Sequence, residues 1–245
     1  MAYREFAAPA ELADLVVCTW ERTVPGSHAS ASQRVVPDGC VDLVWRGAEL
    51  QVAGPDTTAF MSPLEPGATI VGLRFRPGVA GTALGLPASE LLDMRVALDA
   101  LWGRPGSELE ERLGCAEAGH ERRRLLESAI ASRRPRLDLP DPLVLAAGRR
   151  LGLPGSRVGS ISRTLGMSER QLLRRFKAAV GYGPKTLDRV LRFQRFLASA
   201  RAVRRGDENL AGIAAELGYA DQAHLTRECV ELAGLTPRKL IVPGA

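Results

Sequence analysis

Histidine and cysteine are scarce in this sequence, whose 245 residues include three histidines and four cysteines. The cysteines show no C-x-x-C spacing; they are Cys18, Cys40, Cys115 and Cys229. Structural zinc sites and disulfide frameworks depend on closely spaced cysteines, often with histidines. The sequence therefore predicts neither, and we expect no metal, no cofactor and a reducing, cytoplasmic environment.

Long apolar runs are missing as well, and none approaches the roughly 20 residues that a membrane-spanning helix needs. The first 17 residues carry charges throughout, so no secretory signal is expected. A glycine-rich phosphate loop is absent, and three scattered histidines do not support a Ser-His-Asp arrangement. These absences favour a protein that is not an enzyme and does not enter a membrane.

Charge is distributed unevenly between the two parts of the chain. Residues 141–245 contain 18 lysines and arginines against nine acids, a net charge of +9, whereas residues 1–140 contain 15 against 19, a net charge of −4. A basic part joined to an acidic one is typical of a polyanion-binding domain attached to a domain with another role.

Residues 157–201 contain two short amphipathic helical patterns joined by a turn. Gly166 can end the first helix, and Ser168 with Gln171 three residues later forms a capping box for the second. Leu172 and Phe176 face inward in the second helix, which leaves an arginine-rich outer face. Such a face is by itself as often solvated as it is a binding surface.

A second copy of the pattern favours binding. Residues 209–230 carry an apolar stripe that begins at Leu210, a turn at Gly218, and Asp221 as the cap of the next helix. The two caps are 53 positions apart. Between them, Pro184 opens a longer helix. The pattern is therefore helix-turn-helix, connecting helix, helix-turn-helix.

The segments GMSERQLLRRFKAAVGYGPKTLDRVLRFQRFLASAR and LAGIAAELGYADQAHLTRECVELAGLTP resemble the two halves of the DNA-binding domain of AraC-family transcriptional regulators. The resemblance covers roughly residues 141–240. It implies a rigid linker helix that sets two recognition helices into successive major-groove segments, about one helical turn or roughly 34 Å apart.

Arg170 and Arg174 lie one turn apart on the outer face of the first recognition helix and suit bidentate contact with guanine. Gln222, on the second recognition helix, suits adenine. Arg175 and Lys177 suit phosphates, and Leu173 a thymine methyl group. The candidate DNA-binding residues are Ser168, Glu169, Arg170, Leu173, Arg174, Arg175, Lys177, Lys185, Asp221, Gln222, Ala223, His224 and Arg227. After the second recognition helix the family usually has an aromatic residue and basic residues, whereas Cys229, Val230 and Glu231 stand here. Because cations supply much of the affinity, we expect the first unit to dominate binding.

The N-terminal part reads as short strands separated by proline and glycine turns, at residues 15–24, 34–36, 40–45, 50–53 and 69–75. Helical turns are expected at residues 78–86 and 89–92. This pattern predicts an antiparallel barrel or jelly roll. The strings RVVPDGCVDLVW, VAGPDT and VGLRFRPGVAGTALGLPASEL resemble the sensory domain of some AraC-family regulators, especially from actinobacteria, which implies a small cupin-like domain that receives a signal.

Polar and aromatic side chains in these strands are candidates for a ligand pocket, although a tryptophan in a β domain is more often a core residue. The candidates are Trp20, Arg34, Asp38, Cys40, Asp42, Trp45 and Arg74. Cys40, with Cys18 and His28, could alternatively form a reactive-thiol or metal site. The competing interpretation is that the cysteines are small hydrophobic residues and Asp38 a turn residue.

The fold class predicted is therefore α+β with two domains: a β-rich sensory domain at 1–103, a helical connector and linker at 104–140, and an all-α double helix-turn-helix domain at 141–245. The connector's helices either mediate homodimerisation or pack on the β domain. We predict a transcriptional regulator that binds double-stranded DNA and responds to an unidentified small molecule, with RNA polymerase as a further partner. The alternatives are a DNA-associated enzyme or methyl acceptor that uses Cys40, and a non-specific architectural DNA binder.

Overall fold

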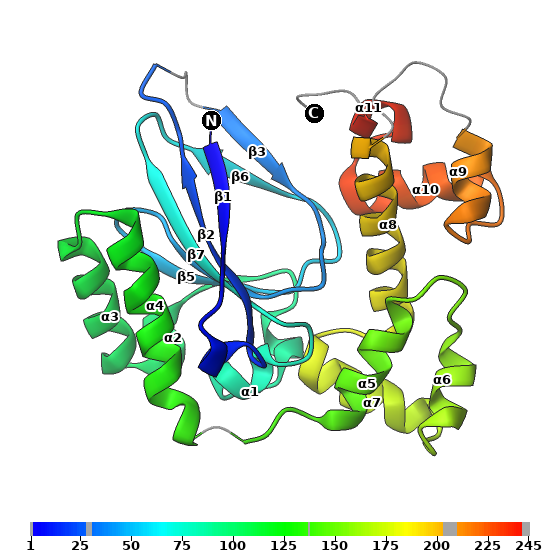
Figure 1. The fold of residues 1–245 in the computed structure, drawn as a ribbon, viewed down its shortest axis with the longest axis horizontal. Coiled ribbons are helices and arrows are strands. Elements are labelled where there is room, and N and C mark those ends of the chain that lie inside the picture. Colours follow the sequence, from blue (N-terminus) through cyan, green and yellow to red (C-terminus); the bar gives the residue numbers. More distant parts are fainter. Residues whose placement is uncertain (1, 28–30, 137, 203–209, 242–245) are drawn as a thin grey trace.

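The computed structural model describes residues 2–27, 31–136, 138–202 and 210–241. An antiparallel β domain with covering helices is followed by an all-helical domain (Figure 1). The predicted two-domain α+β class is confirmed. His28 and Asn209, which the sequence patterns included, lie outside the described residues.

The main sheet has six antiparallel strands in the order β1-β2-β7-β4-β5-β8, and β3 pairs with β6 in a separate two-stranded sheet. The strands are β1 Ala2–Ala7, β2 Val16–Thr23, β3 Ala31–Val35, β4 Asp42–Trp45, β5 Leu50–Ala53, β6 Phe60–Leu64, β7 Thr69–Phe75 and β8 Arg95–Ala97. The sequence patterns identified β2, β3, β4, β5 and β7. They did not identify β1, β6 and β8.

Alternation along each strand gives the main sheet two different faces. Leu43 and Leu73 point to one face and join the large core. Trp20 and Val44 point to the other face, where they form a smaller apolar cluster with Leu64 of β6. Trp20 lies across Gly72, since a Cβ at that glycine would stand 2.2 Å from the indole ring.

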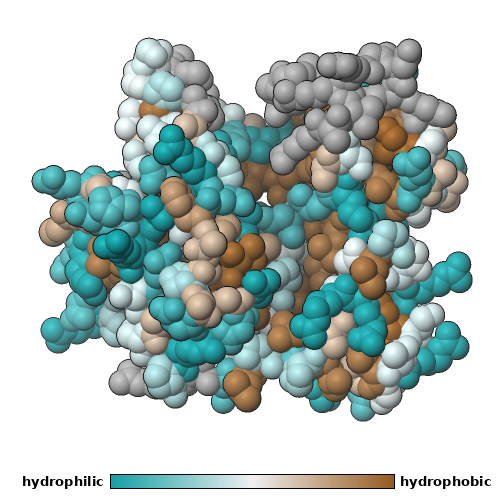
Figure 2. All heavy atoms as spheres, viewed as in Figure 1, coloured by the Kyte–Doolittle hydropathy of each residue, from teal (hydrophilic) through white to brown (hydrophobic). Residues whose placement is uncertain are grey.

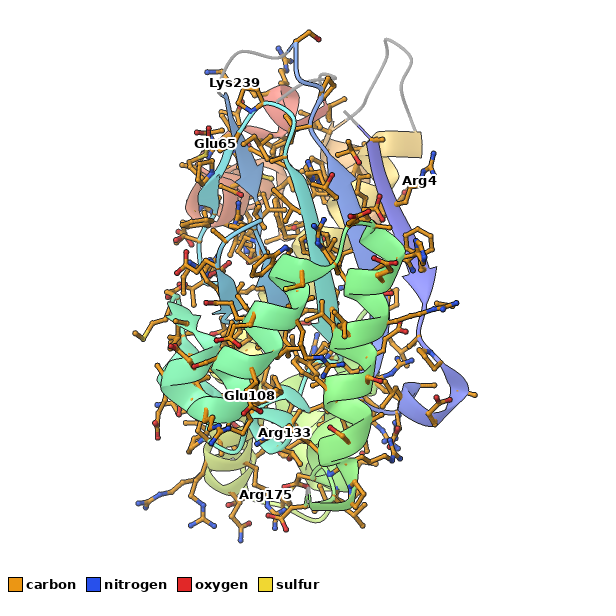
Figure 3. All side chains as sticks on the ribbon, turned by 90° about the vertical axis from the view of Figure 1, so that its left-hand side faces the viewer. Arg4, Glu65, Glu108, Arg133, Arg175 and Lys239 are labelled. Carbon is orange, nitrogen blue, oxygen red and sulfur yellow. The ribbon has the colours of Figure 1, made fainter. Side chains whose placement is uncertain are left out.

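The large core is covered by the helices α1 Ala80–Leu84, α2 Leu98–Trp102, α3 Arg104–Cys115 and α4 Gly119–Arg133, with 3-10 turns η1 Ala10–Leu12, η2 Ala88–Leu91 and η3 Arg134–Arg136. Figure 3 shows α3 and α4 in front of the sheet. Leu109, Leu113, Leu126 and Ile130 are buried in the same core as the strands. Packing on the β domain, one of the two alternatives for the connector, is therefore what the structure shows for these helices.

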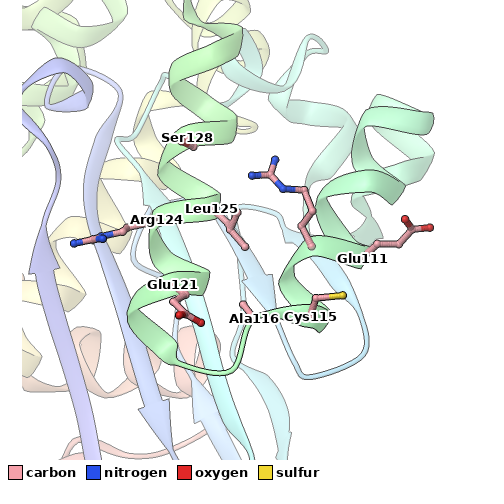
Figure 4. Close-up of a pocket in the computed structure, with 8 residues that line it drawn as sticks. Glu111, Cys115, Ala116, Glu121, Arg124, Leu125 and Ser128 are labelled. Atoms are coloured by element: carbon pink, nitrogen blue, oxygen red, sulfur yellow. The ribbon is translucent and has the colours of Figure 1, made fainter.

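The outer side of this helix pair is hollowed by a groove of about 640 Å³, to which Cys115 contributes from α3 and Leu125 and Ser128 contribute from α4 (Figure 4). Because α3 and α4 share the core of the sheet, we propose that the domain boundary falls at the segment that precedes α5, and not at residue 103.

The C-terminal domain consists of α5 Pro142–Leu151, α6 Val158–Thr164, α7 Glu169–Val180, α8 Pro184–Ala202, α9 Leu210–Glu216, α10 Gln222–Ala233 and α11 Pro237–Ile241. Its core is built around α8, from which Leu187, Val190, Phe193 and Phe196 are fully buried. The helices α6 and α7 lie at one end of α8, and α9 and α10 at the other (Figure 1). Within the described residues, no helix has both the length and the apolar character needed to cross a membrane.

Candidate DNA interface and effector site

The first helix-turn-helix unit has the geometry that its capping pattern predicts. Gly166 adopts a φ of 66°, a left-handed conformation that glycine accommodates without strain. The Gln171 backbone N–H donates to Ser168 Oγ at 3.2 Å, and the Ser168 N–H donates to Gln171 Oε1 at 2.9 Å. This reciprocal pair satisfies two of the free N–H groups at the start of α7 and fixes where the helix begins.

The outer face of α7 is open to solvent. Leu172, Phe176 and Val180 are buried, whereas Arg170, Arg174 and Lys177 are exposed. Ser168, Arg170, Gln171 and Arg174 line a polar hollow of about 360 Å³ at the start of the helix. Leu173 is 40% exposed and rests against Gly183. Glu169 is also exposed at the first helical position.

Arg175, a candidate for phosphate contact, has an intramolecular partner. Its Nη1 lies 2.6 Å from Asp141 Oδ2, and the other oxygen of that carboxylate caps α5 by accepting from the Leu143 N–H at 3.0 Å. Figure 3 shows Arg175 at the lower end of the molecule, with Lys239 of α11 at the opposite end. A phosphate at Arg175 would therefore share the guanidinium with Asp141.

The second unit is capped as predicted, because Asp221 Oδ1 accepts from the His224 N–H at 2.6 Å. Gln222, Ala223 and Arg227 are exposed on α10. His224 is turned inward: its Nδ1 accepts from the Ala220 N–H at 3.3 Å, and its Nε2 lies 3.3 Å from Glu228 Oε1. The imidazole of His224 therefore stabilises the first turns of α10 and does not point outward as Gln222 does.

A buried charge network that the sequence did not indicate ties α10 to α8. Glu228 is only 4% exposed, and Arg192 Nη2 donates to its Oε1 at 2.5 Å. Burial acts to lower the pKa of Arg192, but the Glu228 carboxylate outweighs it and raises that pKa. Arg189 bonds both Glu228 and Glu231. Helical spacing could place Glu228 beside His224, but only the fold brings two arginines from α8 to it.

Lys185 is exposed at the start of α8 and lines a groove of about 540 Å³ between the two helix-turn-helix units. Arg157, Arg192 and Arg195 line the same groove, together with Glu169 and Asp188. Cations outnumber acids there, which suits a stretch of phosphodiester backbone between two major-groove contacts.

Four of the seven candidate ligand residues meet on the face of the main sheet opposite the large core. Arg74 donates from Nε and Nη2 to the two oxygens of Asp42, each at 3.0 Å, and Trp20 Nε1 donates to Asp42 Oδ2 at 3.0 Å. Arg74 Nη2 also lies 3.2 Å from Asp38 Oδ2. We name Trp20, Asp38, Asp42 and Arg74 the polar cluster.

Burial and charge act against each other in the polar cluster. Burial acts to lower the pKa of Arg74, but Asp42 and Asp38 outweigh it and raise that pKa. Burial raises the pKa of Asp42, and the Arg74 guanidinium acts in the opposite direction. Glu5 approaches Arg74 at 3.9 Å from β1. Three carboxylates thus surround a single guanidinium.

Two candidates lie elsewhere. Trp45 is buried in the large core on the opposite face from Asp42, because alternate residues of β4 point in opposite directions. The side chain of Arg34, in β3, contacts the helical domain: its Nη1 donates to the Ala233 carbonyl at the end of α10, at 2.8 Å. Strand register and domain packing therefore separate these two residues from the other candidates.

Cys40 borders the polar cluster and is held in a turn in which its N–H donates to Asp38 Oδ1 at 2.9 Å. Burial, followed by the Asp38 carboxylate, raises the pKa of the Cys40 thiol well above its ordinary value. Because the thiolate is the reactive form, this environment disfavours the reactive-thiol alternative. In the described part of the chain, no three His, Cys, Asp or Glu side chains are grouped to hold a metal ion.

Comparison with known families matches two segments of the chain. Residues 161–241 match the sequence model of a helix-turn-helix domain family, and residues 4–97 match that of a domain of unknown function. Comparison with curated proteins gave no match.

Solved structures of ToxT from Vibrio cholerae resemble the chain at low identity. One is 8% identical, with a TM-score of 0.45 and 99% of each chain covered. An apo form is 11% identical, with a TM-score of 0.44, 91% of this chain covered and 96% of the other. A form bound to an unsaturated fatty acid is 10% identical, with a TM-score of 0.42 and coverage of 93% and 95%.

Proposed function

We propose that this chain, in which residues 161–241 form a helix-turn-helix domain of the AraC type, is a sequence-specific DNA-binding transcriptional regulator whose N-terminal domain receives a small-molecule signal. One observation carries the proposal. Helix α7 begins at a complete capping box and presents Arg170 and Arg174 to solvent one turn apart. A fixed helix with outward arginines suits insertion into the major groove, where an arginine can donate two hydrogen bonds to guanine.

The two units would read one duplex together. Helix α8 has 19 residues and is therefore about 28 Å long at roughly 1.5 Å per residue, close to the roughly 34 Å between successive major-groove segments on one face of DNA. Arg170 and Arg174 would contact bases, Leu173 a thymine methyl group, and Lys177 and Lys185 phosphates. In the second unit Gln222 and Arg227 would contact bases. Ser168 in the first unit, and Asp221 and His224 in the second, would hold the recognition helices in position.

The effector would bind at the polar cluster. Carboxylates outnumber cations there, since Glu5, Asp38 and Asp42 face Arg74 alone. Such a site suits a ligand that donates hydrogen bonds or carries positive charge, and it disfavours a simple anion. Binding would act by shifting the population between domain arrangements, not by catalysing a reaction.

Further partners and the cellular location complete the proposal. A homodimer would form over the groove between α3 and α4, RNA polymerase would be contacted at the promoter, and the protein would act in the cytoplasm. Sedimentation of a Ser128→Arg variant tests the dimer, because Ser128 is exposed in that groove and a large charged side chain there should shift the protein to monomer.

The first experiment is selection of bound sequences from a library of random duplexes at near-physiological salt. We expect enrichment of a bipartite site with two elements about one turn apart. A protein with Arg170 and Arg174 both replaced by alanine should lose the element read by α7 and keep the other. Uniform, steeply salt-dependent binding without enrichment would show a non-specific architectural binder and refute the proposal.

A further inference from the structure

We propose that Glu228 is a positioning residue for DNA reading: its buried carboxylate, held by Arg189 and Arg192 of α8, fixes the direction in which α10 presents its base-reading side chains. This inference rests on the proposed function, because it concerns how the second helix-turn-helix unit selects bases. It assigns a role in specificity to a side chain that is buried and therefore cannot contact a base itself.

Glu228 differs in its location from other polar side chains of the helical domain. Figure 2 shows hydrophilic atoms at the surface over α6 and α7, whereas Glu228 is only 4% exposed. Both of its oxygens have a partner, because Arg192 donates from Nη2 to Oε1 at 2.5 Å and from Nε to Oε2 at 3.3 Å. Arg189 Nε donates to Oε1 as well, at 3.3 Å. Two arginines one turn apart on α8 therefore fix a single carboxylate of α10.

Apolar contacts between α8 and α10 do not by themselves set an angle between the two helices. Leu225, Cys229 and Leu232 of α10 are buried in the same core as Val190 and Phe193 of α8. Such packing is non-directional, whereas a guanidinium with two bonds to one carboxylate accepts a narrow range of geometries. A buried ion pair often adds little stability over apolar packing, and in some proteins its role is to specify one arrangement. The charge network thus sets the rotation of α10 about its own axis.

The network lies directly behind the reading face of α10. Arg227, which is exposed, precedes Glu228 in the chain, and His224 one turn earlier places its Nε2 3.3 Å from Glu228 Oε1. The His224 ring meets the ring of Tyr219 edge-on, with 5.4 Å between centroids, and the Arg192 guanidinium lies 4.9 Å from the same tyrosine centroid. A rotation of α10 that redirected Arg227 would have to break these contacts together.

Arg192 also borders the groove between the two helix-turn-helix units. Its Nη1 lies 3.5 Å from Asp188 Oδ2, and both residues line that groove together with Lys185. A DNA phosphate that enters the groove would therefore lie beside the guanidinium that holds Glu228. Phosphate contacts set the register of a protein on the duplex, so one side chain would connect that register to the direction of α10.

Glu231 provides a matched control on the same helix. Arg189 bonds its carboxylate, as it bonds that of Glu228, but the Glu231 side chain is 61% exposed. Glu228→Gln and Glu231→Gln each remove one negative charge and keep the shape of the side chain. Both variants should bind random duplexes about two- to fivefold more tightly, because one cation becomes available to the phosphates. Only Glu228→Gln should change which bases are preferred.

The measurement is the affinity of the full-length protein for the selected bipartite site and for duplexes with single base-pair substitutions in either element. The element read by α10 is the one that the Arg170→Ala, Arg174→Ala variant retains. In the wild type each substitution there should weaken binding by about fivefold or more, and in Glu228→Gln by about twofold or less. Substitutions in the element read by α7 should keep their full effect in both proteins. Glu231→Gln should discriminate between bases as the wild type does.

The outcomes separate this inference from the proposed function. Unchanged base preference in Glu228→Gln would overturn the positioning role, and so would a loss of preference that Glu231→Gln shares or that extends equally to the α7 element. A wild type that prefers bases in the α7 element alone would also overturn it, while the regulator would still be supported. No preference in either element would count against the regulator, and against this inference with it.

A second variant decides the matter if Glu228→Gln unfolds the second unit, which would appear as a loss of helical circular dichroism. Arg192→Lys keeps a cation beside the groove but cannot make two parallel bonds to the carboxylate. Its base preference should fall in the α10 element only, with affinity for random duplexes unchanged. Full base preference in Arg192→Lys would refute the positioning role.

Discussion

Arginines on the first recognition helix and polar residues on the second differ in what surrounds them. Arg170 and Arg174 have open solvent at the start of α7, whereas α10 follows its exposed Gln222 and Arg227 with the buried Glu228 and the acidic Glu231. Acidic groups near a phosphate backbone reduce its attraction. Residue-level surroundings therefore favour the first unit as the main source of affinity.

Replacing Arg170 and Arg174 together by alanine should weaken binding to the selected site about 100-fold or more, at roughly 1–3 kcal/mol for each bidentate contact. The Gln222→Ala, Arg227→Ala double variant should cost about tenfold. Titration of labelled duplex by fluorescence anisotropy measures both. A larger loss for the α10 pair would refute the predicted dominance of α7.

Cysteine reactivity distinguishes the regulator from the thiol alternative. Cys115 is exposed on α3, whereas burial raises the pKa of Cys18 to about 11 and that of Cys229 to about 12. At pH 8 an alkylating reagent should therefore modify Cys115 first. The Cys18 rate should increase about tenfold per pH unit until pH approaches 11, because only the thiolate reacts. Mass spectrometry of peptides after short exposure to the reagent reports the modification of each cysteine. Rapid modification of Cys40 at pH 7 would support the reactive-thiol alternative.

Secondary elements were predictable where a local signal marks them. The capping box at Ser168, the turn at Gly166 and the strands rich in β-branched residues are properties of neighbouring residues. The strands β1, β6 and β8 were not identified, because each is defined by its pairing: β1 lies at the edge beside β2, and β6 pairs with β3. Pairing partners far apart in the chain leave little trace in a local pattern.

Two glycines test the packing of these elements. Gly72→Ala should destabilise the protein by about 1–3 kcal/mol through overpacking, since the new Cβ would stand 2.2 Å from the Trp20 ring. Gly148→Ala is the matched control: it lies within α5 with nothing near its Cβ position, and it should stabilise the protein by about 0.5–1 kcal/mol. Urea unfolding followed by circular dichroism measures both, and equal stability of the two variants would contradict the close contact of Trp20 with β7.

At the scale of the whole molecule, charge separation predicts how binding responds to salt. The basic residues concentrate after residue 141, and Lys185 lines the groove between the two units. Lys185→Ala should lower affinity nearly equally for all sequences and reduce the slope of log affinity against log salt by about one. Anisotropy titrations at four salt concentrations give this slope. A change in sequence preference without a change in slope would instead place Lys185 at a base.

The sequence by itself determined the helix-turn-helix units, their caps, the exposed arginines of α7 and the division into an acidic β part and a basic helical part. These depend on residues within a few positions of one another or on composition, where helical spacing and capping chemistry are sufficient. Only the tertiary structure decided that Trp45 is a core residue, that Arg34 binds the end of α10, and that Arg192 of α8 reaches Glu228. Those facts depend on strand register and on contacts between residues 36 or 199 positions apart, and such contacts form only when the whole chain has packed.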